Sequence, residues 1–191
     1  MKKHEKGEYG YLKYYRLGKL IGVIVFAAMI EFIVITMLLL WGSTSRVIVV
    51  FAILLALPLA KFFIAFIMCV TFKPLAEEDY KSIRDGIKNE HGILLYDVAI
   101  SRYEGMRFYQ SICVKNGKLC ALAMDKHFDE TKKDYEKWLA GCISDSKYNY
   151  SIYVFSDVRA YIKKADSISE ANDRNRSIDK HIAKTILEMS I

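Results

Sequence analysis

Two long apolar segments, residues 20–41 and 47–72, occupy much of the first third of this 191-residue chain and are joined by a short link, residues 42–46. A helix needs about 20 apolar residues to cross the hydrocarbon core of a bilayer, and both segments reach that length. A soluble core does not require two such helices in immediate succession. The sequence therefore predicts a transmembrane hairpin of two helices that lies in the lipid bilayer.

Basic residues flank this hairpin mainly on one side. Six Lys or Arg residues precede residue 20 and four follow soon after residue 72, whereas Arg46 is the only one in the link. Because Lys and Arg in short flanking segments favour the cytoplasmic side, the sequence predicts a two-pass protein of the cell membrane with both termini in the cytoplasm. The first apolar segment is too long for a typical signal peptide and lacks a small-x-small cleavage site, which favours an uncleaved anchor.

The formal net charge of +6 is not evidence for a nucleic-acid partner. Residues 73–191 hold 20 basic and 19 acidic residues, so the segment after the hairpin is nearly neutral. A surface that binds phosphate backbones needs a local excess of Lys and Arg, and this segment has none at the level of composition. We therefore expect the bilayer, and a protein partner or a second copy of the chain, as partners.

The N-terminal segment, residues 1–19, is both basic and rich in tyrosine, with Tyr9, Tyr11, Tyr14 and Tyr15. Tyrosine favours the headgroup layer, where its ring is buried and its hydroxyl stays in contact with water. The segment is predicted to lie at the membrane surface. The alternative interpretation is that its Lys and Arg cluster recognises anionic lipid.

One ionisable residue lies well inside each predicted transmembrane helix, Glu31 in the first and Lys61 in the second. Charges at this depth are costly and usually find partners. Counted from the link, Lys61 lies about one turn nearer the cytoplasm than Glu31, and helix side chains lean toward their own N-terminus, so each tilts toward the other. The sequence predicts an ion pair that fastens the hairpin. The alternatives are a proton or ion relay, which requires an oligomer, and a Lys61 side chain that reaches the interface without pairing.

The second predicted helix also carries small residues at intervals of four, Ala52, Ala56 and Ala60. Such a stripe permits close approach of another helix. The neighbour is either the first helix, another copy or a partner protein, and the sequence does not choose between them.

Residues 73–191 alternate between helical and strand patterns. Helical spacing follows Pro74, strand patterns cover residues 93–102, 107–115, 118–124 and 148–155, and further helices are expected at 129–143, from 157 onward and along the stripe Ile178, Ile182, Ile186 and Met189. The sequence predicts a small cytoplasmic α+β domain in the order α-β-β-β-α-β-α, with a four-stranded, mostly antiparallel sheet. The last helix is expected either to pack on the sheet or to bind a partner.

The dipeptide Asn116-Gly117 predicts a tight β-hairpin, because a type I′ turn needs positive φ at both central residues. A two-residue loop at this position sets Cys113 directly opposite Cys120. In a reducing cytoplasm these thiols are expected to pack as small apolar groups, and a redox pair is the alternative. Two opposed thiols supply only half of a zinc site and no histidine neighbours them in the sequence, so no metal is predicted.

The order helix, three strands, helix, strand resembles the core of the PD-(D/E)XK nuclease-like fold. Those nucleases hold Mg²⁺ through an acid on one central strand and a Glu/Asp-x-Lys motif on the next. The strand patterns 107–115 and 118–124 contain no acid, Asp125 is not followed by the required lysine spacing, and Asp97 has no partner motif. No other catalytic or nucleotide-binding motif is present, and no cofactor is predicted.

The sequence thus predicts a membrane-anchored interaction or regulatory module without enzymatic activity. Two alternatives remain. The first is a membrane-tethered enzyme, in which a cleft would hold Asp97, Glu104 or Asp125 beside a Lys or His. The second is a hairpin subunit of a transport assembly that uses Glu31 and Lys61. A small-molecule ligand is not identifiable from the sequence.

Overall fold

The computed structural model describes residues 4–41, 46–87, 92–103, 105–125, 127–143, 150–169 and 176–191. Within these ranges the chain forms six helices and a four-stranded mixed sheet, so the α+β class is as predicted. The chain divides into two compact units: Leu12–Phe72 is one, and the residues up to Tyr11 together with Lys73–Ile191 form the other. The second unit is called the α+β domain below.

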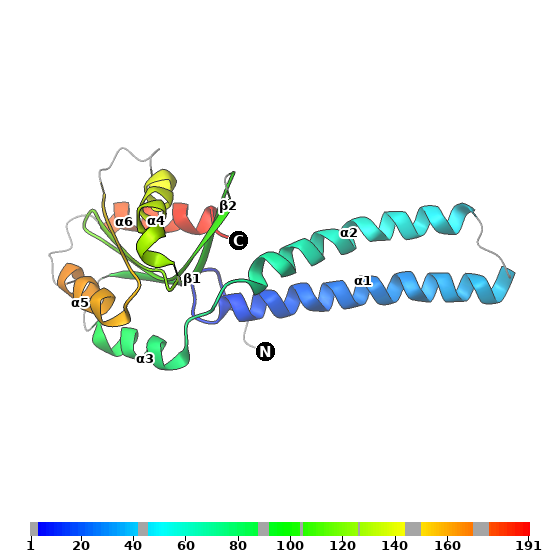
Figure 1. Ribbon diagram of the computed structural model, residues 1–191, viewed down its shortest axis with the longest axis horizontal. Helices are drawn as coiled ribbons and strands as arrows, with labels where there is room; N and C mark the ends of the chain where they lie inside the picture. The colour runs from blue at the N-terminus through cyan, green and yellow to red at the C-terminus, as the bar shows by residue number, and fades with distance from the viewer. Residues whose placement is uncertain are drawn as a thin grey trace. The chain divides into compact units, whose positions relative to one another are not determined.

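The first unit consists of α1 (Tyr11–Trp41) and α2 (Arg46–Val70), both shown in Figure 1. Both helices are long and apolar enough to cross a membrane, and most of their apolar side chains are exposed. Such exposure is costly in water and suits a lipid surrounding. The helix α1 begins earlier than the predicted residue 20, because the basic and aromatic stretch before the apolar segment is itself helical.

The two helices contact each other through a small residue and aromatic rings. The rings of Phe26 and Phe62 are stacked with their centroids 5.5 Å apart, and a Cβ at Gly22 would overlap the Phe62 ring. At the end that carries both connections to the α+β domain, the Arg16 guanidinium donates to the carbonyl oxygen of Phe72. A glycine in a transmembrane helix commonly permits this kind of close approach.

The α+β domain begins with α3 (Glu77–Gly86), followed by β1 (Ile93–Arg102), β2 (Gly105–Lys115) and β3 (Lys118–Leu122). The helix α4 (Phe128–Ile143) leads to β4 (Ser151–Phe155), and α5 (Val158–Ser169) and α6 (Arg176–Glu188) complete the chain. The strands are ordered β1-β2-β3-β4, and only the β3–β4 pair is parallel, with α4 as the crossover. The prediction of a mostly antiparallel sheet is confirmed.

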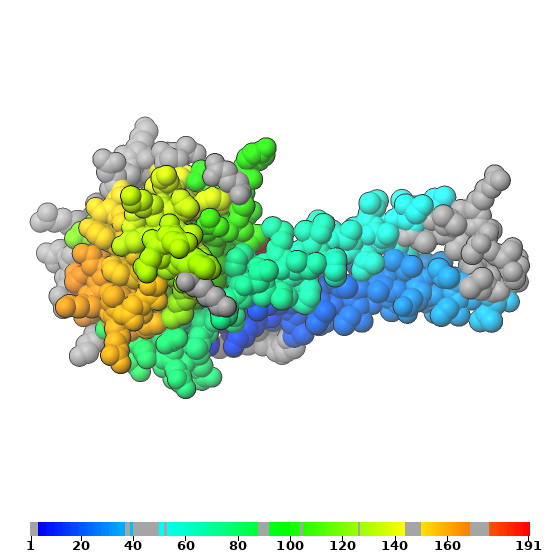
Figure 2. All heavy atoms as spheres, viewed as in Figure 1, coloured from blue at the N-terminus to red at the C-terminus, as the bar shows by residue number. Residues whose placement is uncertain are grey.

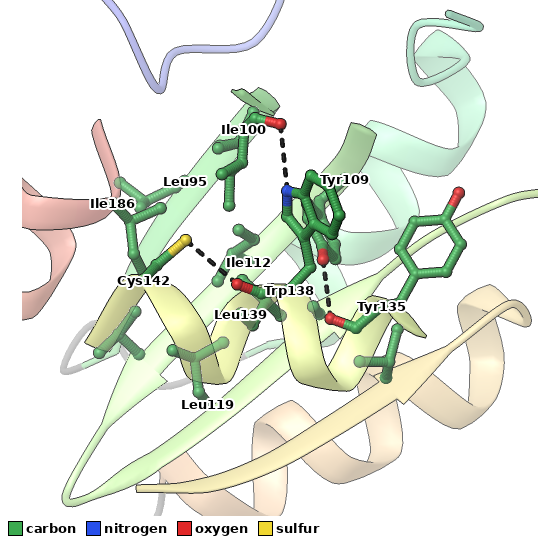
Figure 3. Packing of buried hydrophobic residues seen from close by; sticks show 14 of the residues in the cluster. Leu95, Ile100, Tyr109, Ile112, Leu119, Tyr135, Trp138, Leu139, Cys142 and Ile186 are labelled. Carbon is green, nitrogen blue, oxygen red and sulfur yellow. Dashed lines mark hydrogen bonds between the residues drawn. The ribbon is translucent and has the colours of Figure 1, made fainter. Parts of the chain in front are cut away.

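Helices cover both faces of the sheet (Figure 1). On one face α4 and α6 pack over strand residues that include Tyr109, Ile112 and Leu119 (Figure 3). On the other face α3 and α5 enclose Leu122 and Tyr161. This explains why β2 is buried without interruption from Phe108 to Lys115: a central strand covered on both faces does not alternate between buried and exposed side chains. The last helix therefore packs on the sheet, one of its two predicted roles.

The hairpin turn has the predicted geometry. Asn116 and Gly117 have φ of 48° and 73°, and Cys113 pairs with Cys120 across the strands. Asp179 of α6 then holds this turn in place: its carboxylate accepts the Asn116 N–H at 2.8 Å and the Tyr150 hydroxyl at 2.9 Å. The turn is thus fixed both by its local sequence and by a buried acid from the last helix.

The outer edge of β1 is covered by both ends of the described chain. Near its middle, the Tyr96 N–H donates to the Gly7 carbonyl at 2.8 Å. Farther along, Ile100 forms an antiparallel bridge with Ser190, and the Lys6 ammonium donates to the Ser190 carbonyl at 2.7 Å. An uncovered edge strand is a template for unwanted pairing, and here the two terminal segments satisfy part of it. Residues 4–10 thus belong to the α+β domain, and the prediction that residues 1–19 lie at the membrane surface stays a prediction.

Candidate functional site

The predicted intramembrane residues Glu31 and Lys61 are both exposed on their helices. The ion pairs within 4.0 Å in the described part of the chain are His4–Glu8, Glu77–Lys81 and Lys184–Glu188, and Glu31 and Lys61 are not joined. Their pairing and its role stay predictions. Of the small-residue stripe, Ala56 and Ala60 are exposed, while the side chain of Ala52 lies outside the described residues.

The opposed cysteines Cys113 and Cys120 are not joined by a disulfide, and both are fully buried. Burial raises the pKa of the Cys120 thiol to about 12, and the nearby Cys113 adds to the shift. A protonated thiol without access to solvent is a poor nucleophile and a poor metal ligand. The pair therefore acts as core packing between β2, β3 and α5 in this structure.

The enzyme alternative named Asp97, Glu104 or Asp125 as candidate acids, and the two that the structure describes bond to different parts of the domain. Asp97 is buried on β1 with a φ of 52°, and it accepts the Gly10 N–H at 2.9 Å. Asp125 accepts the Tyr135 hydroxyl at 2.9 Å near the start of α4. Glu104 lies outside the described residues. Among the residues that the structure describes, no group of three His, Cys, Asp or Glu is placed to hold a metal ion.

A different set of side chains gathers at the β1–β2 tip, where the hairpin projects from the domain (Figure 2). The hollow beside it has a volume of about 430 Å³ and is lined by Arg102, Arg107, Asp134, Lys137 and Trp138. We call it the arginine cleft. Arg102 and Arg107 are diagonal neighbours on one face of the hairpin, because Arg102 pairs with Gly105 and Arg107 with Ile100.

The Trp138 ring of α4 forms the floor of the arginine cleft, and Tyr135 of the same helix also contacts Arg107. The guanidinium carbons of Arg102 and Arg107 lie 5.5 and 5.3 Å from the Trp138 ring centroid, and Arg107 also lies 5.6 Å from the Tyr135 centroid. A guanidinium at such distances is attracted by the ring face. The two cations are thereby held above one buried tryptophan.

Hydrogen bonds connect Trp138 and the nearby Tyr135 to the sheet. The Trp138 indole N–H donates to the Ile100 carbonyl at 3.4 Å, and the Tyr109 hydroxyl donates to the Tyr135 carbonyl at 2.9 Å (Figure 3). Burial, followed by the hydrogen bond to Asp125, raises the pKa of the Tyr135 hydroxyl, so it stays a neutral donor. A Cβ at Gly141 would overlap the Arg102 guanidinium, and glycine at this position leaves room for it over α4.

The arginine cleft is not among the sites predicted from the sequence. Two arginines on either side of a tight turn look like ordinary solvated charges, and Trp138 fits the apolar stripe of α4. The available signal was the pairing register: Arg102 pairs with Gly105 and Arg107 with Ile100, and this register places both arginines on one face of the hairpin. That register depends on tertiary packing as well as on local pattern.

A second cluster lies where the N-terminal segment meets the domain. The Tyr9 and Tyr80 rings are stacked with centroids 4.0 Å apart, and Tyr80 meets Tyr96 edge-on at 5.2 Å. These tyrosines border a hollow of about 440 Å³ together with His4 and Glu8. Burial raises the pKa of Tyr96 to about 12. The cluster serves to fasten residues 4–10 to the domain and carries little charge.

No protein-family model, curated protein or solved structure matches this chain. The likeness to the nuclease-like core therefore rests on the order of its elements alone, and that order does not imply an activity.

Proposed function

We propose that this chain is a two-pass membrane protein with both termini in the cytoplasm, and that its α+β domain acts as a membrane-anchored interaction or regulatory module. One observation supports the proposed topology. The chain before α1 and the chain after α2 fold into the same compact unit. Two segments that share one folded unit must lie on the same side of a bilayer, so the helices between them cross it an even number of times.

The contacts on both sides of the helices support this argument. Tyr96 of β1 bonds to Gly7, which precedes α1, and the Gln110 amide of β2 donates to the Lys73 carbonyl, which follows α2, at 3.3 Å. Cleavage of α1 as a signal sequence would remove Gly7 and Gly10 from the domain and leave the Tyr96 N–H and the buried Asp97 without these partners. The basic residues on the same flank favour the cytoplasmic side.

The structural roles of the acids favour an interaction module over an enzyme. Asp97 and Asp179 are buried and accept backbone N–H groups, and Asp125 orders a tyrosine. Each of these carboxylates has a structural task that a catalytic acid or base would have to share. The membrane-tethered enzyme and the transport subunit remain the alternative proposals.

Topology is tested by labelling single added cysteines in intact cells. Tyr103 is fully exposed at the β1–β2 tip, and Ser43 lies in the link. We expect a membrane-impermeant maleimide to label Ser43→Cys in intact cells and Tyr103→Cys only after permeabilisation. Background from Cys113, Cys120 and Cys142 is low because these thiols are buried. Labelling of Tyr103→Cys in intact cells, or release of the chain from membranes by alkaline carbonate, would overturn the proposed topology.

The module is tested by mapping its contacts. Cross-linking mass spectrometry on the full chain in detergent should give a stoichiometric partner, or a second copy, with cross-links to the surface of the α+β domain. A chain that purifies alone as a monomer contradicts this part of the proposal. Ion flux in proteoliposomes that Glu31→Gln abolishes, with the fold unchanged, would instead favour the transport subunit.

A further inference from the structure

We propose that the arginine cleft binds the phosphate group of a small ligand, with the guanidinium groups of Arg102 and Arg107 as its main contacts. This proposal is independent of the membrane topology argued above. It starts from the charge of the described lining residues, in which Arg102, Arg107 and Lys137 face a single acid, Asp134.

Among the described lining residues, the basic side chains of the cleft outnumber the acidic one. Among the described residues, no carboxylate lies within 4.0 Å of Arg102 or Arg107, although Asp134 is part of the same lining. The Nε atom of Arg107 is buried and has no hydrogen-bond partner, and its Nη1 atom only reaches the Met106 carbonyl at 3.5 Å. The described residues thus give this guanidinium few acceptors, and its remaining donors can bind an anionic oxygen in the cleft.

The geometry fits an oxyanion with several acceptor atoms. A guanidinium is a planar fork of donors that matches phosphate or carboxylate oxygens in pairs. The Trp138 ring holds both forks side by side, which reduces the conformational entropy that binding would otherwise cost. A phosphate has a higher charge and more oxygens than a carboxylate. It therefore fits two guanidinium groups and a nearby ammonium better.

Packing alone does not explain the arrangement. The aliphatic stems of two arginines do shield Trp138 from water, and this explains why long side chains cover the ring. It does not account for like charges placed as diagonal neighbours on a hairpin, since like charges at such positions repel. A bound anion removes that repulsion.

The size of the cleft leaves room for more than a phosphate group. Its volume of about 430 Å³ exceeds the space of one phosphate and falls in the usual range for small-molecule sites. The remainder accommodates the rest of a small phosphorylated molecule or the headgroup of an anionic lipid. Both sources present the same phosphate to the two arginines.

The test uses Trp138 as a reporter in the full chain. The chain holds two tryptophans, so Trp41→Phe leaves Trp138 as the only one. We expect glycerol phosphate, titrated at constant ionic strength into the protein in phosphatidylcholine nanodiscs, to give a saturable change in fluorescence that chloride does not give. Arg102→Gln and Arg107→Gln should each weaken binding by about tenfold or more, because each removes a charge-assisted pair of hydrogen bonds.

A matched control separates specific binding from general charge. Arg159 is an exposed arginine of α5 outside the cleft, and Arg159→Gln should leave the binding constant unchanged. Near-ultraviolet circular dichroism checks that the variants fold. If Arg107→Gln fails to fold, Lys137→Glu changes the charge at the rim without touching a buried group, and it should also weaken binding. The proposal would be overturned if glycerol phosphate and chloride gave the same change in fluorescence. It would also be overturned if Arg159→Gln weakened binding as much as the cleft variants do.

A second arm distinguishes the two sources of phosphate. In nanodiscs that contain phosphatidic acid, a headgroup bound in the cleft would alter Trp138 fluorescence before any addition and weaken the binding of glycerol phosphate. Arg102→Gln would reduce both effects. If phosphatidic acid has no effect while glycerol phosphate binds, the ligand is soluble. If neither binds, the proposal is wrong.

Discussion

Asp97 on β1 and Gln110 on β2 lie at the same level of the sheet and hold the two chain segments that lead into and out of the apolar helices. They fall between the paired residues Tyr96–Ser111 and Val98–Tyr109. Asp97 accepts the Gly10 N–H just before α1, and Gln110 donates to the Lys73 carbonyl just after α2. Both connections are therefore fixed at one point of the domain, where the positive φ of Asp97 interrupts the β1 ladder.

The Asp97 carboxylate is expected to contribute strongly to stability. Asp97→Ala removes the acceptor of the Gly10 N–H and places an alanine at a φ of 52°, so we expect a loss of about 2 to 4 kcal/mol in the free energy of unfolding. Asp97→Asn keeps an acceptor oxygen and tolerates the left-handed backbone, and it should cost less than about 1 kcal/mol. Thermal unfolding of the full chain in detergent measures both. An equal loss in the two variants would show that the charge matters, and not the hydrogen bond.

Gly7 is expected to be required for fastening the N-terminal segment to β1. It has a φ of 89°, and a Cβ there would lie 3.0 Å from Leu187 and 3.3 Å from Leu95. Gly7→Ala should cost about 1 to 3 kcal/mol locally and speed hydrogen exchange at the Tyr96 amide, which donates to Gly7. The control is Gly18→Ala within α1, where a Cβ meets nothing within 4 Å. Unchanged exchange at Tyr96 in Gly7→Ala would contradict the proposed attachment.

Asp179 is expected to lock α6 onto the β2–β3 turn. Asp179→Ala leaves the Asn116 N–H and the Tyr150 hydroxyl without this buried acceptor, with an expected loss of about 2 to 4 kcal/mol. Tyr150→Phe removes one of the two bonds and should cost about 1 kcal/mol. On the same helix, Glu188→Ala removes only an exposed ion pair with Lys184 and should cost less than about 0.5 kcal/mol. A small effect of Asp179→Ala would mean that the turn sequence alone holds the hairpin.

Stability is expected to fall at alkaline pH. Burial raises the pKa of Cys120 from 9.0, and that of Tyr96 from 10.0, to about 12 in each case. Between the unfolded and the folded pKa of each group, the folded state binds more protons than the unfolded state. The stability that the neutral thiol contributes is therefore fully present below pH 9 and is lost as the pH rises toward 12. Cys120→Ala should reduce the slope of melting temperature against pH above pH 9. The exposed Tyr103→Phe should not change that slope, and the same slope in Cys120→Ala would refute the assignment.

Several elements follow from local sequence alone. The strand Ile93–Arg102 has the predicted bounds, and the dipeptide Asn116-Gly117 fixes the register that opposes Cys113 to Cys120. Apolar length identified the two long helices, although α1 extends back to Tyr11. These features depend on residues close together in the chain: apolar periodicity, turn conformation and helix length act within one element.

Three sets of contacts could be identified only in the folded domain. They are the attachment of Gly7 and Gly10 to β1, the hydrogen bond from Gln110 to Lys73, and the contact of Arg102 and Arg107 with Trp138. Each joins residues on separate elements, and periodicity carries no information about which elements become neighbours. Tyr9 is an example: its residue type indicates a membrane surface, which stays a prediction, whereas its packing against Tyr80 is visible only in the folded domain. Side-chain chemistry sets which contacts are favourable, and the packing of helices on both faces of the sheet selects the ones that form.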